Sequence, residues 1–240
     1  MKNQQPPEPF RKHDDGSVLD LHSMFLTLQG EGPYTGHPAL FIRLAGCSLQ
    51  CPGCDTEYTQ GRQSITASDL SNKAFDMLSA KPRATKLVVI TGGEPTRQNL
   101  SRLCFDLSYA GYHIQIESNG MHSLPDRLIQ MIRNGDVTLC VSPKTARINE
   151  DAWVNASYFK YVIDDRHVDP FDGLPTISLG HTASPRVVRP PSTFEGSIFV
   201  TPMDTGDDNQ NLANMHACVK SALKFGYVCN SQAHKVWGLA

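Results

Sequence analysis

The sequence predicts an α/β fold, arranged as a partial (βα) barrel with about six parallel strands. Short apolar runs alternate with segments of helical periodicity along most of the chain. Repeated βα units of this kind form parallel sheets with right-handed crossovers. Polar motifs also follow the ends of successive apolar runs, where barrel proteins place their functional residues. The length of 240 residues suits one such domain.

The expected elements follow in order along the chain. Residues 1–16 are polar and proline-bearing, which predicts a disordered leader before a single domain over residues 17–240. Order is expected to begin near residues 18–28. Strands are expected at the short apolar runs, which are residues 39–45, 86–91, 113–117, 136–141, 158–163, 197–200 and 227–230. Helices are expected at 66–80, with Thr66 as N-cap, and at 100–110, 125–134 and 209–225. The proline-rich segment 164–195, after the fifth parallel strand, is predicted to be irregular.

Composition limits the functional classes. Hydrophobic residues make up 40% of the chain and the formal net charge is −2. No apolar run approaches the roughly 20 residues needed to span a bilayer, so no membrane association is expected. No Lys/Arg cluster provides an electrostatic footprint for nucleic acid, so no direct nucleic-acid partner is expected. Seven cysteines, an odd number, without an apolar signal segment favour the cytoplasm over a disulfide framework.

Three cysteines on one short loop carry the strongest chemical signal. Cys47, Cys51 and Cys54 have the spacing C-x3-C-x2-C, directly after the apolar run 39–45. Structural zinc and iron–sulfur sites complete their coordination with a fourth protein ligand, whereas three thiolates leave one position open for a reacting molecule. The spacing therefore favours a [4Fe–4S] cluster with one free iron, and half of a zinc site is the alternative. The remaining cysteines are expected to be buried small hydrophobes, namely Cys104, Cys140, Cys218 and Cys229.

The motif Gly92-Gly93-Glu94-Pro95 ends the apolar run 86–91. It lacks the lysine and the length of a P-loop and the spacing of a dinucleotide fingerprint. Its two glycines allow the backbone to approach a ligand closely, and its carboxylate can accept an ammonium group. Taken alone, the motif is also compatible with a plain turn.

Together the cysteine loop and this turn resemble the radical S-adenosylmethionine superfamily. In that superfamily three cysteines hold a [4Fe–4S] cluster, whose open iron chelates the methionyl group of S-adenosylmethionine. Further motifs resemble, in the same order, the family of the 7-carboxy-7-deazaguanine synthases, and the resemblance extends from residue 28 to the C-terminus. These motifs are LQGEG at 28–32, FIRLAGC at 41–47, CDT at 54–56, VITGGEP at 89–95, IESNG at 116–120, VSPK at 141–144 and QAHK at 232–235.

The resemblance implies a fold and a reaction. The fold is the partial barrel of the radical S-adenosylmethionine type. The reaction converts 6-carboxy-5,6,7,8-tetrahydropterin to 7-carboxy-7-deazaguanine with loss of ammonia, a step of queuosine and other 7-deazapurine biosynthesis. The implied cofactors are a [4Fe–4S] cluster, S-adenosylmethionine and Mg²⁺, with a flavodoxin- or ferredoxin-type reductant and a homodimeric state. A glycyl-radical-activating enzyme and a non-catalytic metal-binding interaction protein are the alternatives.

The resemblance also implies site residues by position. The cluster ligands are Cys47, Cys51 and Cys54, and the Mg²⁺ ligand is Thr56. The cosubstrate-binding residues are Asp55, Gly92, Gly93, Glu94, Ser142, Pro143 and Lys144. The substrate-binding residues are Leu28, Gln29, Gly30, Glu31, Arg43, Thr91, His234 and Ala240, the last through the carboxylate at the chain end. These residue types suit the substrate, because Arg43 can pair with its carboxylate and Gln29 and Glu31 can match the pterin edge.

Some positions depart from the family pattern or have other interpretations. Gly53 precedes the third cysteine, where relatives usually carry an aromatic residue that backs the adenine. Thr201 stands where relatives usually carry a glutamine that contacts the cosubstrate. Arg43 is also compatible with a buried ion pair and His234 with a packed core histidine. Glu117 and Asn119 are expected to cap a strand end rather than to contact ligand.

Overall fold

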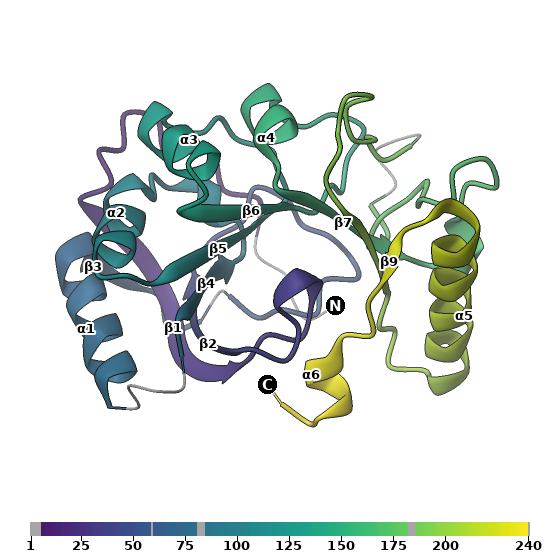
Figure 1. Ribbon diagram of the computed structural model, residues 1–240, viewed down its shortest axis with the longest axis horizontal. Coiled ribbons are helices and arrows are strands. Elements are labelled where there is room, and N and C mark those ends of the chain that lie inside the picture. The colour runs from purple at the N-terminus through teal and green to yellow at the C-terminus, as the bar shows by residue number, and fades with distance from the viewer. Residues whose placement is uncertain (1–5, 59, 81–84, 182–185, 240) are drawn as a thin grey trace.

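The structure is a computed structural model that describes residues 6–58, 60–80, 85–181 and 186–239. Nine strands form a single sheet in the order β3-β1-β2-β4-β5-β6-β7-β8-β9. The sheet is curved, with helices α1 to α5 along its outer side and α6 at its open side (Figure 1). Among the described residues, the outermost strands β3 and β9 do not pair with each other, so the sheet is open.

The predicted parallel sheet is confirmed from β2 to β9. Neighbouring strands in this part of the sheet are parallel throughout. Their bounds are β2 Pro38–Leu44, β4 Leu87–Gly92, β5 His113–Ser118, β6 Val137–Val141, β7 Tyr158–Ile163, β8 Ile198–Pro202 and β9 Val228–Cys229. Most residues of β2 and of β4 to β8 are buried, whereas both residues of β9 are exposed.

Two antiparallel strands that the sequence did not predict extend the sheet. They are β1 (Val18–Leu28) and β3 (Gln63–Thr66). β1 pairs with β2 in a register that joins Leu28 to Pro38, at the start of β2. The residues after β1 therefore lie beside the start of β2. The cysteine loop follows the end of β2 and so lies at the opposite end of the strands.

Helices α1 to α5 lie in the connections between strands, and α6 follows the last strand. Their bounds are α1 Ala67–Ser79, α2 Ser101–Tyr109, α3 Asp126–Arg133, α4 Glu150–Asn155, α5 Asp208–Phe225 and α6 Ala233–Val236, with 3₁₀ turns at Gly32–Tyr34, Pro95–Arg97 and Asp165–His167. The predicted N-cap of α1 is confirmed, because the Thr66 hydroxyl oxygen accepts a hydrogen bond from the Asp69 N–H at 3.0 Å. The short helices α4 and α6 were not predicted, because neither is long enough to show a helical period.

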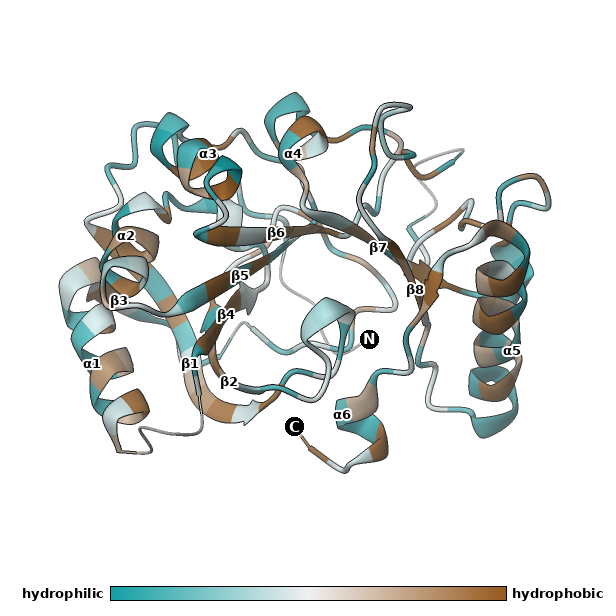
Figure 2. Ribbon diagram, in the orientation of Figure 1, coloured by the Kyte–Doolittle hydropathy of each residue, from teal (hydrophilic) through white to brown (hydrophobic). Residues whose placement is uncertain are grey.

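The core lies between the sheet and its outer helices. Apolar residues are concentrated in the strands, whereas the helices carry both apolar and polar bands (Figure 2). One cluster joins strand residues such as Ile42, Ile90 and Ile116 to helix residues such as Leu70 and Leu103, all fully buried. At about 25 cal/mol per Å² of apolar surface, burial of this kind is the main favourable term in folding. No helix in the described residues is long and apolar enough to cross a membrane.

The segment after β7 is irregular, as predicted, and hydrogen bonds to side chains hold it in place. The Asp172 carboxylate accepts hydrogen bonds from Arg189 Nε at 2.7 Å and Nη2 at 2.9 Å. Tyr227 donates to the Asp172 carbonyl oxygen at 2.6 Å, and Trp153 Nε1 donates to the Arg189 carbonyl oxygen at 2.8 Å. These hydrogen bonds fix the segment in a place where a regular βα repeat would have a helix.

The described part of the predicted leader, residues 6–16, differs from the prediction of a segment with little to pack against. The Glu8 N–H donates to the Cys47 carbonyl oxygen at 2.7 Å, and the Glu8 carboxylate lies 3.2 Å from Arg97 Nη2. Phe10 stacks on His122 with 5.2 Å between ring centroids. This segment therefore lies against the outside of the cysteine loop, while the domain boundary at residue 17 stays a prediction.

The scattered cysteines follow the prediction with one exception. Cys104, Cys140 and Cys218 are buried, whereas Cys229 is exposed. Cys229 lies in β9, a strand of two residues at the edge of the sheet, where no further strand covers it.

Candidate functional site

A cavity of about 570 Å³ lies among β1, β2, β4, β5, β7, the cysteine loop and α6. Many residues predicted from the sequence line it, namely Leu28, Gln29, Gly30, Glu31, Arg43, Asp55, Thr56, Thr91, Ser142, Lys144 and His234. The other predicted residues that the structure describes are not among those that line the cavity, namely Cys47, Cys51, Cys54, Gly92, Gly93, Glu94 and Pro143. The predicted contact of Ala240 lies outside the described residues.

The cysteine loop leaves the end of β2 and carries three free thiols. Cys47 and Cys51 are buried and Cys54 is half-buried. Burial raises the pKa of the Cys47 thiol to about 12 and that of the Cys51 thiol to about 11. A buried thiolate needs a positive partner, and a metal centre deprotonates coordinating thiols outright.

The donor set is three thiols on one loop. No three Cys, His, Asp or Glu side chains among the described residues are placed to hold one metal ion. In a [4Fe–4S] cluster each thiolate binds a different iron, so three soft donors on one loop suit this group without converging on a point.

The glycine pair after β4 packs directly against the cysteine loop. A Cβ at Gly93 would lie 2.1 Å from the Gly46 carbonyl oxygen and 3.0 Å from Cys47 Cβ. The Gly93 N–H donates to the Leu44 carbonyl oxygen at 3.1 Å, and the Glu94 N–H donates to that of Gly46 at 2.8 Å. Only a residue without a side chain permits this approach, so the motif fixes the position of the loop.

The Glu94 carboxylate is fully buried and serves the fold. It accepts hydrogen bonds from the Thr96 N–H at 2.9 Å, the Thr96 hydroxyl at 2.6 Å and the Ser118 hydroxyl at 2.8 Å. Its other oxygen accepts from the Asn119 N–H at 2.6 Å. Four donors from two strand ends thus converge on one carboxylate. Its predicted contact with the ammonium group of a cosubstrate stays untested.

Arg43 is a half-buried cation that faces the cavity. It projects from β2, and its guanidinium lies over the Phe25 ring at 5.7 Å. Within the described residues it makes no hydrogen bond and no ion pair, so the buried ion pair considered from the sequence is not observed. Burial lowers the pKa of Arg43, against the opposing influence of Asp55 and Glu117. An arginine stays charged under such conditions, so this one can receive a ligand anion.

The opposite wall carries charges that are already paired. Lys160, on β7, forms ion pairs with Glu31 and, at 3.4 Å, with Glu117. Gln232 Nε2 donates to Glu31 Oε1 at 2.8 Å. Burial by itself would raise the pKa of Glu31, but the charge of Lys160 and its hydrogen bond lower that pKa to about 2. Lys160 and Glu117 both line the cavity. The sequence analysis missed Lys160, and it expected Glu117 to cap a strand end rather than to face a ligand.

Gln29 joins this wall to β5. Its side-chain amide donates to Gln115 Oε1 and to Glu117 Oε1, each at 3.1 Å, and its oxygen accepts from the Glu31 N–H at 3.1 Å. Gln115 in turn donates to the Tyr158 hydroxyl at 2.7 Å. A network in which the polar groups are paired in this way is rigid, which suits the recognition of a ligand edge.

His234, on α6, lies against Gly30. A Cβ at Gly30 would lie 2.0 Å from His234 Nδ1, so glycine is required there. The Ala233 N–H donates to the Gly30 carbonyl oxygen at 3.0 Å, which ties the two segments together. His234 is half-buried and lines the cavity, so it is not enclosed in the core.

The ends of β6 and β8 approach the cysteine loop. Lys144 Nζ donates to the Ser142 carbonyl oxygen at 2.8 Å and to its hydroxyl at 2.5 Å, and burial lowers the pKa of Lys144. Lys235 bridges two carboxylates, lying 2.8 Å from Asp55 Oδ2 and 2.9 Å from Asp204 Oδ2. Its hydrogen bond lowers the pKa of Asp204 to about 2. Lys235 thereby ties α6 to the cysteine loop.

The structure shows what surrounds Gly53 and Thr201, the two positions that depart from the family pattern. Beside Gly53, the Met203 methyl lies 2.7 Å from where a Cβ would stand, so an aromatic ring would displace Met203. The Gly53 N–H donates to the carbonyl oxygen of Leu179, which lines the cavity. Thr201 is fully buried, and its hydroxyl has no hydrogen-bond partner in the described part of the chain.

Lys160 had a signal in the sequence. Like Arg43, it is a single charge inside an apolar strand, Tyr158–Ile163. A charge of this kind is rarely buried unless it is paired or functional. Its partners Glu31 and Glu117 lie 129 and 43 residues away, so the pairing itself was not visible in the sequence.

Comparison with known proteins gives a family match. The model of the Radical SAM superfamily matches residues 41–163. A 7-carboxy-7-deazaguanine synthase from Rhodospirillum rubrum is 37% identical over 238 residues, which cover 94% of each chain. A 7-carboxy-7-deazaguanine synthase from Rickettsia prowazekii is 34% identical over 234 residues, covering 94% of this chain and 90% of that one.

One solved structure supports the fold. The crystal structure of QueE from Escherichia coli matches with a TM-score of 0.64 and 23% sequence identity, over 89% of this chain and 93% of that one. At this identity the similarity shows a shared fold, and it agrees with the largely parallel sheet described above.

Proposed function

The chain belongs to the family of the 7-carboxy-7-deazaguanine synthases, within the Radical SAM superfamily, and on this premise we propose how its cavity serves the reaction. The enzyme converts 6-carboxy-5,6,7,8-tetrahydropterin to 7-carboxy-7-deazaguanine with loss of ammonia. No observation favours a glycyl-radical activase or a non-catalytic binding protein, because the family match covers nearly the whole chain.

The unpaired cation of Arg43 carries the proposal. A guanidinium that faces a cavity without a counter-ion is costly unless a ligand supplies the charge. The substrate carboxylate can do so through two parallel hydrogen bonds. Glu31, on the opposite wall, offers an acceptor to the pterin ring, and His234 lines this side. Gln29 lines the same wall, where its amide N–H groups donate to Gln115 and Glu117 and hold the wall in place. The cavity thus matches a flat molecule with an anion at one end and a polar edge at the other.

The cysteine loop supports the cofactor assignment. We assign Cys47, Cys51 and Cys54 as ligands of the [4Fe–4S] cluster, which together with bound S-adenosylmethionine supplies one-electron radical chemistry. Lys144 and Asp55, which line the cavity beside the loop, are the proposed cosubstrate contacts with Ser142, Pro143, Gly92, Gly93 and Glu94. This places the radical source at one end of the cavity and the substrate anchors along its walls, which provides orientation for the reaction.

Further assignments are part of the same proposal. Thr56, whose hydroxyl donates to Asp55 Oδ1 at 3.3 Å and which lines the cavity, is the proposed Mg²⁺ ligand. Mg²⁺ needs few protein oxygens when a substrate supplies the others. We also propose a flavodoxin- or ferredoxin-type reductant, a homodimer, a single domain over residues 17–240, and the cytoplasm as the compartment. Free cysteines throughout the described residues support a reducing compartment.

Anaerobic turnover tests this function. The protein is reconstituted with iron and sulfide, reduced with dithionite, and incubated with S-adenosylmethionine, Mg²⁺ and 6-carboxytetrahydropterin. We expect mass detection of 7-carboxy-7-deazaguanine with release of ammonia. A reconstituted protein with full cluster absorption that forms no such product would contradict the proposal.

A further inference from the structure

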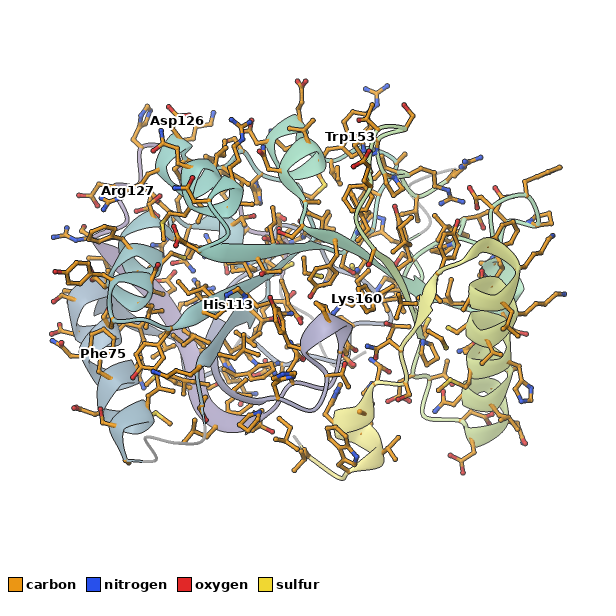
Figure 3. All side chains as sticks on the ribbon, viewed as in Figure 1. Phe75, His113, Asp126, Arg127, Trp153 and Lys160 are labelled. Atoms are coloured by element: carbon orange, nitrogen blue, oxygen red, sulfur yellow. The ribbon has the colours of Figure 1, made fainter. Side chains whose placement is uncertain are left out.

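Lys160 is the least expected charge in the cavity. It projects from the apolar strand β7 and is only 7% exposed (Figure 3). It forms ion pairs with Glu31, from the segment after β1, and with Glu117, at the end of β5. One ammonium group therefore joins two carboxylates from distant parts of the chain.

This arrangement has a physical cost that the fold alone does not explain. Transferring one lysine and two carboxylates from water costs several kcal/mol per ion, and apolar residues of similar volume are often as stable. Three charges of this kind leave a net charge of −1 on one wall. Arg43 lines the same cavity and carries a charge of the opposite sign.

The geometry also leaves acceptor capacity on both carboxylates. A carboxylate has about four lone-pair sites. Glu31 accepts from Lys160 and Gln232, while Glu117 accepts from Lys160 and from the amides of Gln29 and Gln115. Both carboxylates line the cavity, so their remaining lone pairs can accept N–H groups of a ligand.

We propose that Lys160 is a positioning residue that fixes Glu31 and Glu117 as a paired acceptor edge for the N–H groups of the substrate's pyrimidine ring. The inference rests on the proposed function and adds to it the device that selects the pterin. Without the ammonium group, two carboxylates facing one another would repel, and one would turn away or take up a proton. With it, both stay ionised and aimed at the cavity.

Selection follows from the chemistry of this edge. A pterin carries an amino group at C2, which donates hydrogen bonds. A lumazine carries a carbonyl oxygen at the same position, which would face carboxylate lone pairs. Sites built to hydrogen-bond a donor reject analogues that lack it far more strongly than apolar pockets reject a missing methyl group.

The test compares two air-stable ligands that differ only at C2, 6-carboxypterin and 6-carboxylumazine. Equilibrium binding of both is measured on the reconstituted protein with S-adenosylmethionine. The variants are Lys160→Met, which removes the charge, and Lys160→Arg, which keeps it. The matched control is Lys86→Met, an exposed lysine that contacts only the Tyr112 ring, at 5.5 Å, among the described residues.

We expect the wild-type protein and Lys86→Met to prefer the pterin by at least about 10-fold. Lys160→Met is expected to lose most of this preference, and Lys160→Arg to retain it. Cluster absorption near 400 nm and S-adenosylmethionine binding are expected to be unchanged in all variants. A merely structural lysine would weaken both ligands equally, and an unchanged preference in Lys160→Met would overturn the inference.

Two further measurements keep the outcome clear. If Lys160→Met does not fold, the double variant Lys160→Met/Glu117→Gln removes one charge of each sign, and it is expected to show the same loss of preference. Turnover of the wild-type protein separates the two proposals. A protein that forms no deazaguanine contradicts the proposed function, whereas one that forms it but keeps its pterin preference without Lys160 contradicts only this inference.

Discussion

The two walls of the cavity solve the problem of buried charge in opposite ways. On the side of β2 and the cysteine loop, Arg43 is half-buried and the thiols of Cys47 and Cys51 are buried, and within the described residues none of the three forms an ion pair. On the side of β5 and β7, Lys160, Glu31 and Glu117 are paired with one another. The first wall depends on groups that come from outside, and the second is complete before any ligand arrives.

This difference shows what each wall contributes. Unpaired groups gain most of their stabilisation from the bound cluster and the bound anion, so their ligands bind tightly and their loss is severe. Paired groups lose little freedom on binding, so they give orientation and selection more than affinity. Substitutions in the two walls should therefore differ in kind as well as in size.

The largest effect is expected on the first wall, from Cys51→Ala. Two remaining thiolates do not hold the cluster, so the cluster absorption at about 400 nm and product formation should both be lost. The exposed Cys229→Ala serves as control and should retain both. Full cluster absorption in Cys51→Ala would show that the loop does not bind the cluster through this residue.

The next effect concerns Glu94, behind the first wall. Glu94→Gln should lower the free energy of unfolding by about 2–3 kcal/mol, because buried donors to a charged acceptor lose part of their partner. Denaturant unfolding of the apoprotein measures this loss, with the exposed Glu195→Gln as control. If the carboxylate instead served mainly as a ligand for the cosubstrate ammonium group, stability would be unchanged and S-adenosylmethionine affinity would fall.

Arg43→Lys is expected to weaken substrate binding by about 2 kcal/mol, which is about 30-fold, and to leave S-adenosylmethionine binding unchanged. An ammonium group does not reproduce the two parallel hydrogen bonds of a guanidinium to a carboxylate. Titration of 6-carboxypterin measures the change. The control is Arg127→Lys on α3, where the guanidinium lies over Phe105 at 4.0 Å and is not among the residues that line the cavity. Equal weakening of both ligands would point to a structural arginine.

The smallest effect is expected from Lys235→Met, where the walls meet. Its bridge to Asp55 and Asp204 is partly exposed, so its loss should cost about 0.5–1 kcal/mol. Because the pKa of Asp204 is lowered from 3.8 to about 2, the bridge contributes fully above about pH 3.8 and fades as the pH falls toward 2. Thermal unfolding at pH 7 and pH 2.5 measures this, with the exposed Lys73→Met as control. The difference from wild type should be smaller at pH 2.5 than at pH 7, and a difference of the same size at both would contradict the assignment to Asp204.

The sequence predicted the elements whose signals are local. The apolar runs that form β4 and β7 and the cap at Thr66 needed no distant partner to be recognised. β1 was missed as an antiparallel strand, because its partner β2 and its register are set by contacts that no local pattern encodes. α6 was missed because four residues show no period.

The site followed the same division. Arg43 could be predicted, because a charge within an apolar strand is visible in the chain and the family resemblance gave it a ligand. Lys160 showed the same local signal but no such resemblance, and only the fold brings Glu31 and Glu117 to it. For Glu94 the opposite holds. Its motif suggested a contact with ligand, whereas the fold surrounds its carboxylate with four hydrogen-bond donors of the protein.

The separate roles of the two walls can be tested in one set of binding measurements. Equilibrium affinities for S-adenosylmethionine and for 6-carboxypterin are determined anaerobically on the wild-type protein, Cys51→Ala and Arg43→Lys. We predict that Cys51→Ala loses S-adenosylmethionine binding while retaining 6-carboxypterin, and that Arg43→Lys shows the reverse pattern. Loss of both ligands in either variant, with the fold intact by circular dichroism, would contradict the account.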